Sequence, residues 1–169
     1  GAVAASLLRA SRTATQTVSA GSTIVFTQID ATAGSDISLN TSTGQITLAP
    51  SRTYRLFAAV PGGSGVARPA FEWYNETTAS YIGSIHEFYY ATDGAGNSSS
   101  GSPAEYIFTP AVTTVVSFRC INATSFTAGG NADYSLLGSY PWCEITVIAA
   151  FAPALQGASG ATGPAGANG

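Results

Sequence analysis

The sequence contains no lysine, no methionine and only one histidine, and charged residues make up 9% of its 169 residues. Six arginines against nine acidic residues give a net charge of −3, so the chain has no basic stripe to follow a nucleic-acid backbone. It also has no run of 18 or more uncharged apolar residues that could cross a membrane as a helix. We therefore expect the protein neither to bind nucleic acid nor to insert into a membrane. Ordinary soluble domains carry about 25% charged residues, so we expect other copies of the chain to cover much of this surface.

The same scarcity limits catalysis. The single histidine, His86, has no second histidine or neighbouring cysteine with which to hold a metal, and residue alternation places it in a strand as a core or interface residue. No nucleophile elbow, phosphate loop, dinucleotide fingerprint or zinc-protease motif occurs. The segment Asp93–Asn97 offers two oxygen ligands for calcium, but a glycine-rich hairpin loop explains it without an ion. We expect no enzyme, no cofactor and no metal site.

What the sequence does contain is a glycine period at its end. Over residues 157–169, GASGATGPAGANG, every third residue is glycine: Gly157, Gly160, Gly163, Gly166 and Gly169. Only glycine fits at the crowded axis of three supercoiled polyproline-II chains, so this pattern predicts the start of a collagen-like triple helix. A flexible linker is the alternative interpretation, but a linker has no reason to keep five glycines in phase. A collagen helix needs three chains, and the period therefore predicts a homotrimer.

The rest of the chain, residues 1–155, is long enough for one domain with its own core, and residues 156–169 form the collagen-like segment. The absence of methionine leads us to expect a module of a longer polypeptide. The domain is predicted to be all-β, because short runs rich in Val, Ile, Thr, Phe and Tyr alternate with Gly, Pro, Asn and Ser clusters. The expected strands cover residues 2–10, 22–29, 36–40, 44–49, 53–60, 70–75, 81–91, 104–110, 112–122, 132–137 and 143–151. Strands at this spacing indicate a sandwich or jelly roll.

Alternation also predicts which side chains are buried. Tyr54, Leu56, Ala58 and Val60 share one apolar face of their strand. The last strand, residues 143–151, is apolar on one face and partly so on the other, and we expect it to lie in the middle of a sheet and under a neighbour.

Residues 22–61 resemble the first half of a C1q-like globular head, of the tumour-necrosis-factor jelly-roll superfamily. The residues that carry the likeness are Phe26, Asn40, the turn Thr43-Gly44, Ile46, Leu48, Pro50 and Tyr54. Residues 140–150, YPWCEITVIAA, resemble the closing strand of the family, and residues 2–10 resemble its first strand, which pairs with the closing one. The resemblance implies a homotrimer of ten-stranded jelly rolls joined to collagen, as in complement and in the collagen-like fibres of spores, phages and large viruses. In complement the stalk precedes the head, whereas here it follows.

Aromatic residues concentrate between residues 71 and 90, where we expect them in the core or at the trimer axis; an exposed glycan-binding face is the alternative. They are Phe71, Trp73, Tyr74, Tyr81, Phe88, Tyr89 and Tyr90.

Cys120 and Cys143 share strand parity with apolar neighbours, so both thiols should point into the sandwich, either as a disulfide or as free buried cysteines. Four asparagines begin N-x-[ST] triplets and are possible glycosylation sites if the protein meets a glycosylating pathway: Asn40, Asn75, Asn97 and Asn122.

Two functions remain after these exclusions. The first is a structural trimeric head of an exterior collagen-like fibre, with a virion surface favoured over a spore, that registers the stalk. The second is a recognition head that attaches to a host glycan or protein receptor through exposed loops, at residues 61–69, 91–103 and 127–132. Both functions predict an extracellular or virion-surface location.

Overall fold

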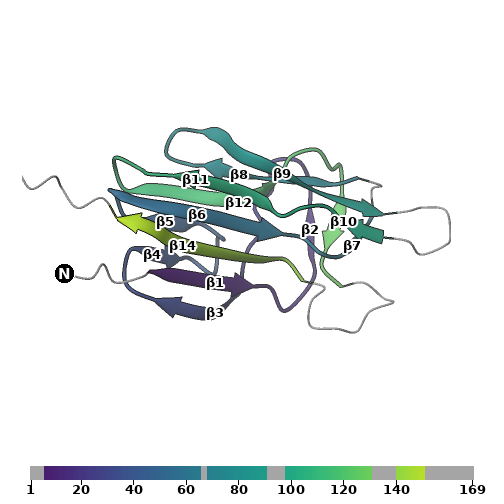
Figure 1. Ribbon diagram of the computed structural model, residues 1–169. Helices are drawn as coiled ribbons and strands as arrows, with labels where there is room; N and C mark the ends of the chain where they lie inside the picture. Colours follow the sequence, from purple (N-terminus) through teal and green to yellow (C-terminus); the bar gives the residue numbers. More distant parts are fainter. Residues whose placement is uncertain (1–5, 66–67, 91–97, 131–139, 151–169) are drawn as a thin grey trace, which may run out of the picture.

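The computed structural model describes residues 6–65, 68–90, 98–130 and 140–150. They form a sandwich of two antiparallel sheets that face each other, with a small third sheet at one end (Figure 1). The strands are β1 (Leu7–Ser11), β2 (Gln16–Val18), β3 (Gln28–Ala33), β4 (Ile37–Leu39), β5 (Ile46–Leu48), β6 (Arg52–Ala59), β7 (Gly63–Gly65), β8 (Ala70–Asn75), β9 (Ser80–Tyr90), β10 (Ser98–Ser100), β11 (Ala104–Phe108), β12 (Thr114–Cys120), β13 (Phe126–Ala128) and β14 (Trp142–Ala150).

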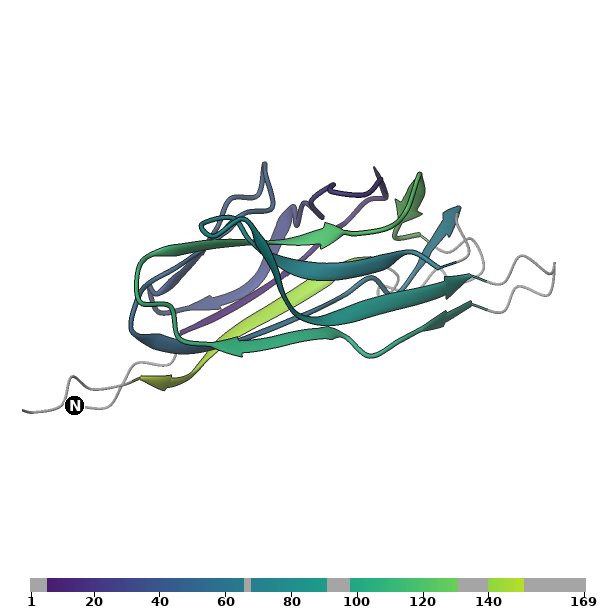
Figure 2. The same cartoon turned by 90° about the horizontal axis from the view of Figure 1, so that it is seen from above.

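The strand order shows a jelly roll. One sheet has five strands in the order β11-β6-β14-β1-β3, and the other has six in the order β10-β9-β8-β12-β5-β4. The third sheet has the order β2-β13-β7. Every pairing is antiparallel, and the view from above separates the two main layers (Figure 2). Within the described residues there is no helix, so none could cross a membrane, and the all-β prediction is confirmed.

The expected partners of the last strand are also confirmed. β14 lies in the middle of the five-stranded sheet, between β6 and β1. It pairs with β1 from Leu7 opposite Thr146 to Ser11 opposite Trp142. A strand with neighbours on both edges satisfies its backbone groups within the sheet, which suits a segment as apolar as residues 143–150.

Some strand predictions were wrong. Residues 24–27 form no strand, although Ile24 and Phe26 are fully buried; the strand begins instead at Gln28 and continues to Ala33, beyond the predicted end at residue 29. Burial of isolated side chains in a loop mimics strand alternation in the sequence. The described residues contain fourteen strands, several of them only three residues long, where the residue pattern predicted eleven and the family resemblance implied ten. The expected strand at 132–137 lies outside the described residues.

The core fills the space between the two sheets. Tyr54, Leu56, Ala58 and Val60 are all 0% exposed, so the predicted face of β6 is confirmed. From the opposite sheet, Val116, Phe118, Phe71 and Trp73 pack into the same core, with ring centroids of Trp73 and Phe118 5.4 Å apart. These aromatic contacts are tilted, the geometry that aromatic pairs prefer.

The two sheets meet along the edge where β9 approaches β11. Ser84 Oγ donates to the Glu105 carbonyl at 3.3 Å, and the Glu105 amide donates back to Ser84 Oγ at 2.8 Å. Beside it, Gly83 has a φ of +90°, and a Cβ there would lie 2.6 Å from the Glu105 carbonyl oxygen. Only glycine fits this close approach, which falls at a register shift between β8 and β9.

The described chain enters and leaves at the same end of the sandwich. At the start of β1, the Ser6 carbonyl accepts a hydrogen bond from the Val147 amide near the end of β14. At the other end of the same two strands, Ser11 pairs with Trp142, toward the side on which β7 and β10 lie (Figure 1).

Candidate functional site

The outer face of the five-stranded sheet is the first candidate interaction surface. Strand alternation points Arg55, Phe57, Trp142, Glu144 and Ile148 away from the core. Phe57 and Trp142 pack against each other on this face, near the end where β14 begins, with ring centroids 5.6 Å apart. The Arg55 guanidinium lies 4.4 Å from the Phe57 ring centre, and its Nε is 2.6 Å from Glu105 Oε1. The face thus combines half-buried aromatic rings with an ordered ion pair.

Large apolar side chains remain exposed on this face and beside it. Ile148 on β14 is 51% exposed and Ile107 on β11 is 52% exposed. At the β9–β11 edge, Ile85 is 50% exposed. Single exposed apolar residues are ordinary, but several of them on one sheet face and its edge are typical of a protein interface.

A pocket of about 610 Å³ opens at the end of this face where β1 ends and β14 begins. We call it the tip pocket. Its lining includes Arg9, Arg12, Gln28, Asp30, Tyr140 and Trp142. The volume falls within the range of small-molecule sites, and the lining combines aromatic rings with convergent polar groups.

Arg12 forms a fixed wall of the tip pocket. Its guanidinium donates to three backbone carbonyls: Ala14 at 3.0 Å, Thr15 at 3.3 Å, and Val25. Burial lowers the pKa of Arg12, but a guanidinium remains charged in proteins. Because carbonyls and not a carboxylate hold this side chain, its positive charge is not neutralised by them.

Asp30 and Arg9 face the same space. Asp30 Oδ1 accepts hydrogen bonds from Ser11 Oγ at 3.1 Å and from Gln28 Nε2 at 2.8 Å, which orient the carboxylate. Arg9 is exposed on β1, opposite Glu144 in the strand register. Within the described residues Arg9 forms no ion pair, whereas Arg52, Arg55 and Arg119 each have one.

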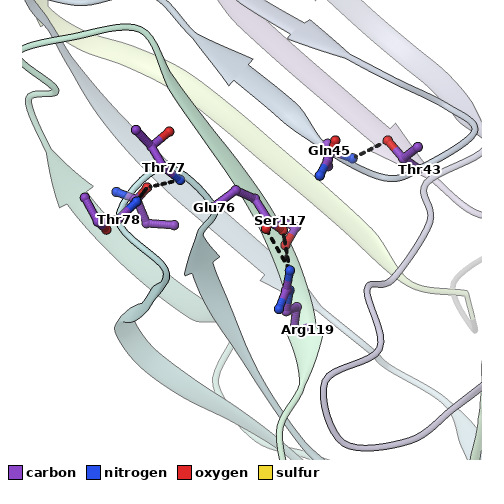
Figure 3. Close-up of polar contacts among 8 residues, drawn as sticks. Thr43, Gln45, Glu76, Thr77, Thr78, Ser117 and Arg119 are labelled. Carbon is purple, nitrogen blue, oxygen red and sulfur yellow. Dashed lines mark hydrogen bonds and ion pairs between the residues drawn. The ribbon is translucent and has the colours of Figure 1, made fainter.

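The outer face of the six-stranded sheet carries a second polar cluster. Arg119 Nη2 contacts both carboxylate oxygens of Glu76 at 2.6 and 2.7 Å, and Ser117 Oγ donates to Glu76 Oε1 at 2.6 Å (Figure 3). The Arg119 guanidinium also lies 3.8 Å from the Tyr74 ring centre. Each charge here has a partner within the chain, so the cluster is satisfied internally and stabilises the face.

The predicted aromatic cluster divides between core and surface. Phe71 and Trp73 are 0% exposed and Phe88 is 1% exposed, so these three belong to the core. Tyr74 and Tyr81 form an edge-on pair on the outer face with centroids 4.9 Å apart, and Tyr81 is 43% exposed. Tyr89 and Tyr90 belong to β9, but their side chains lie outside the described part of the structure.

The two cysteines are free and fully buried, so the disulfide that the sequence left open is not formed. Cys120 lies on β12 in the six-stranded sheet and Cys143 on β14 in the five-stranded sheet. Stacked sheets are about 10 Å apart, whereas a disulfide needs Cα atoms within about 7 Å. Burial raises the pKa of the Cys143 thiol, which therefore stays protonated and unreactive.

The predicted glycosylation sites differ in access. Asn40 is exposed, and its Oδ1 accepts from the Ser42 amide at 3.0 Å in a turn. Asn75 is only 9% exposed and caps the turn that follows β8, so a glycan does not fit there without rearrangement. Asn122 is exposed, but its Nδ2 donates to the Arg68 carbonyl at 3.1 Å. Asn97 lies outside the described residues.

His86 is a core residue, as the sequence predicted: it is 0% exposed, and its ring nitrogens lie 3.0 Å from the Ser102 carbonyl and 3.1 Å from the Val60 carbonyl. The described residues contain no cluster of metal-ligating side chains. The segment Asp93–Asn97, for which a hairpin loop was preferred over a calcium site, and the glycines at 157–169 lie outside the described residues.

All three expected recognition loops are partly strand. Residues 63–65 form β7, and residues 98–100 form β10. Residues 126–128 form β13, which pairs with both β7 and β2. Residues 91–97 lie outside the described part of the chain.

The tip pocket was not predicted from the sequence. Its members come from β1, the segment after it, β3 and the start of β14, and no spacing in the sequence connects them. The available signal was the placement of two of the six arginines within four residues, at Arg9 and Arg12.

Comparison with known proteins supports the fold. No family model and no curated protein matches the sequence. The structure is similar to the globular domain of zebrafish complement 1qA protein, with a TM-score of 0.58 and 14% identity, over 86% of this chain and 99% of that one. It is also similar to the Eiger TNF of S. frugiperda, with a TM-score of 0.59 and 8% identity, over 90% of this chain and 96% of that one. The chain therefore has the jelly-roll fold of C1q and TNF head domains.

Proposed function

We propose that this protein is a non-enzymatic, homotrimeric head domain of an exterior collagen-like fibre, in which it holds three chains in register at the start of the stalk. The observation that carries the proposal is the outer face of the five-stranded sheet. There Ile107 and Ile148 are each about half exposed, with no further layer of the described chain over them. The C1q- and TNF-like fold supports the same role, because the head domains that it resembles imply a trimer.

A closed ring of three identical chains needs two different surfaces on each chain, one of which docks on the other in the next copy. The described residues offer such a pair. The first is the outer face with Ile107 and Ile148, and the second is the β9–β11 edge with Ile85. Edge strands carry unpaired backbone groups and need a cover, and docking on a neighbour provides one.

The glycine period suggests what the trimer does, which is to hold three collagen-like segments together. β14 ends at Ala150, and the G-x-y run begins seven residues later at Gly157. A trimer of heads holds three such segments together and raises their effective concentration before the triple helix forms. We propose an extracellular or virion-surface location for this fibre.

The test is a pair of matched substitutions. Ile148→Asp places a carboxylate on the proposed interface, where burial without a partner is costly, and should convert the trimer to monomer at micromolar concentration. Val112→Asp, at a position 60% exposed between β11 and β12, should leave the trimer intact. Sedimentation velocity measures both. If the two variants behave alike, the five-stranded face is not the interface.

A recognition head is the second candidate function, and the tip pocket favours it. The pocket lies at the opposite end of β1 and β14 from the point where the chain enters and leaves. A head on a stalk presents that end outward. The binding of a glycan or a receptor there is compatible with a trimer that registers the stalk.

A further inference from the structure

We infer that the tip pocket binds a sugar ring that carries a carboxylate, with Arg9 pairing with the carboxylate and Trp142 covering the apolar face of the ring. This inference rests on the recognition role, the second proposed function, and does not depend on the trimer.

The charge of the pocket selects an acidic group. Arg9 and Arg12 bring two guanidinium groups to a protein whose net charge is −3. Arg12 is bound to backbone carbonyls, and Arg9 has no ion pair among the described residues, even though Glu144 lies opposite it in the register. A guanidinium with free donors binds a carboxylate through two parallel hydrogen bonds. Arg9 is the arginine that can do so.

The remaining polar groups favour a ligand that also has hydroxyls. Asp30 is held by Ser11 and Gln28, and a carboxylate has acceptor capacity left for further donors. It would repel an anion placed beside it but accepts hydrogen bonds from hydroxyl groups. A small acid without hydroxyls satisfies Arg9 and leaves Asp30 unused, whereas a sugar acid matches both.

The aromatic wall favours a ring. Trp142 is half-buried and is fixed against Phe57 on one side, so its position is set before any ligand arrives. An indole offers a flat apolar surface with a polar edge, which suits the C–H face of a pyranose. Because Arg12, Asp30 and Trp142 are each held by other parts of the chain, little conformational entropy is lost on binding.

The experiment titrates the full chain, residues 1–169, with D-glucuronate, D-glucose and acetate, using calorimetry and tryptophan fluorescence. Trp142 should report binding, since the other tryptophan, Trp73, is 0% exposed. Glucuronate should bind more tightly than either glucose or acetate. Equal affinity for acetate and glucuronate would overturn the sugar assignment, and equal affinity for glucose would overturn the role of Arg9.

Two variants sharpen the test. Arg9→Gln should weaken glucuronate binding about tenfold or more, because a hydrogen-bonded charge is lost, and should leave glucose binding unchanged. Arg52→Gln removes the same charge from the other end of the same sheet and should bind glucuronate like the unmodified chain. If Arg9→Gln and Arg52→Gln bind equally well, the inference is wrong.

The oligomeric state of the same samples separates the two proposals. A trimer that binds no glucuronate at millimolar concentration overturns this inference and leaves the trimeric head standing. A monomer that binds glucuronate through Arg9 supports this inference and overturns the trimeric head. If Arg9→Gln abolishes the trimer itself, the tip pocket is an interface between copies and the inference fails.

Discussion

Tyr54 shows how one residue connects the two sheets with the loops between them. Its ring is fully buried, and its hydroxyl donates to the Ala49 carbonyl at 2.8 Å and lies 3.2 Å from the Asp36 carbonyl. Burial, with a smaller contribution from the Asp36 carboxylate, raises the pKa of Tyr54 to about 12. The folded protein therefore keeps this proton at a pH where the unfolded chain, with a tyrosine pKa near 10, loses it.

The sign of the resulting pH dependence follows. Below about pH 10 both states are protonated and Tyr54 adds no pH dependence; above it the unfolded state releases a proton that the folded state keeps, so the free energy of unfolding falls. We predict a loss of about 2–3 kcal/mol between about pH 10 and pH 12 from this residue. Denaturant titrations across that range measure it.

Tyr54→Phe provides the control for the alkaline prediction. The variant should lose about 1–2 kcal/mol of unfolding free energy at pH 7, because it lacks the hydroxyl that donates to the Ala49 carbonyl. Its free energy of unfolding should also fall less between about pH 10 and pH 12, because the tyrosine that titrates there has been removed. The same pH dependence in both proteins would show that Tyr54 is not the group responsible.

At the scale of elements, the β9–β11 edge depends on Gly83. Adding a Cβ there places it 2.6 Å from a backbone oxygen and also imposes a φ of +90° on a residue that resists it. Gly21 has a similar φ of +86° with nothing within 4 Å of the added Cβ. Gly21→Ala therefore measures the cost of the backbone conformation alone, about 1–2 kcal/mol.

We predict that Gly83→Ala lowers the free energy of unfolding clearly more than Gly21→Ala, since the edge must also open to admit the methyl group. Urea unfolding of both variants checks this. Equal losses would mean that the approach of β9 to β11 does not depend on the glycine.

The glycine period is an element whose structure is still a prediction. Gly163→Ala, in a chain extended with further G-x-y triplets, should locally unwind the triple helix, because each chain then places a methyl group at the axis. Replacement of Ala161, in a middle slot, should change little. Circular dichroism melting of the extended chain compares them, and equal tolerance at both positions would favour the linker interpretation.

Strand alternation explains why part of the fold could be predicted. The buried face of β6 and the central place of β14 follow from patterns within one strand, and the structure has both. The prediction failed at residues 24–27 because Ile24 and Phe26 are buried although they belong to no strand, and their burial depends on long-range packing. The tip pocket could not be predicted from the sequence for the same reason, since β1, β3 and β14 are brought together only by the fold.

At the scale of the whole molecule, the low charge and the exposed apolar groups have one explanation. A chain with 9% charged residues has few groups to keep an apolar sheet face soluble. In the proposed trimer, three copies bury the part of this face around Ile107 and Ile148 against one another, and this contact also brings three β14 strands together. The stability of the head then depends on its concentration, as in any obligate oligomer.

The most direct test of this account is the mass in solution of residues 1–156, the head without its glycine period, by sedimentation equilibrium at micromolar concentration. The account predicts a single species with three times the mass of one head, formed without help from a collagen helix. A stable, folded monomer would contradict it, because the outer face of the five-stranded sheet would then be a soluble surface in its own right.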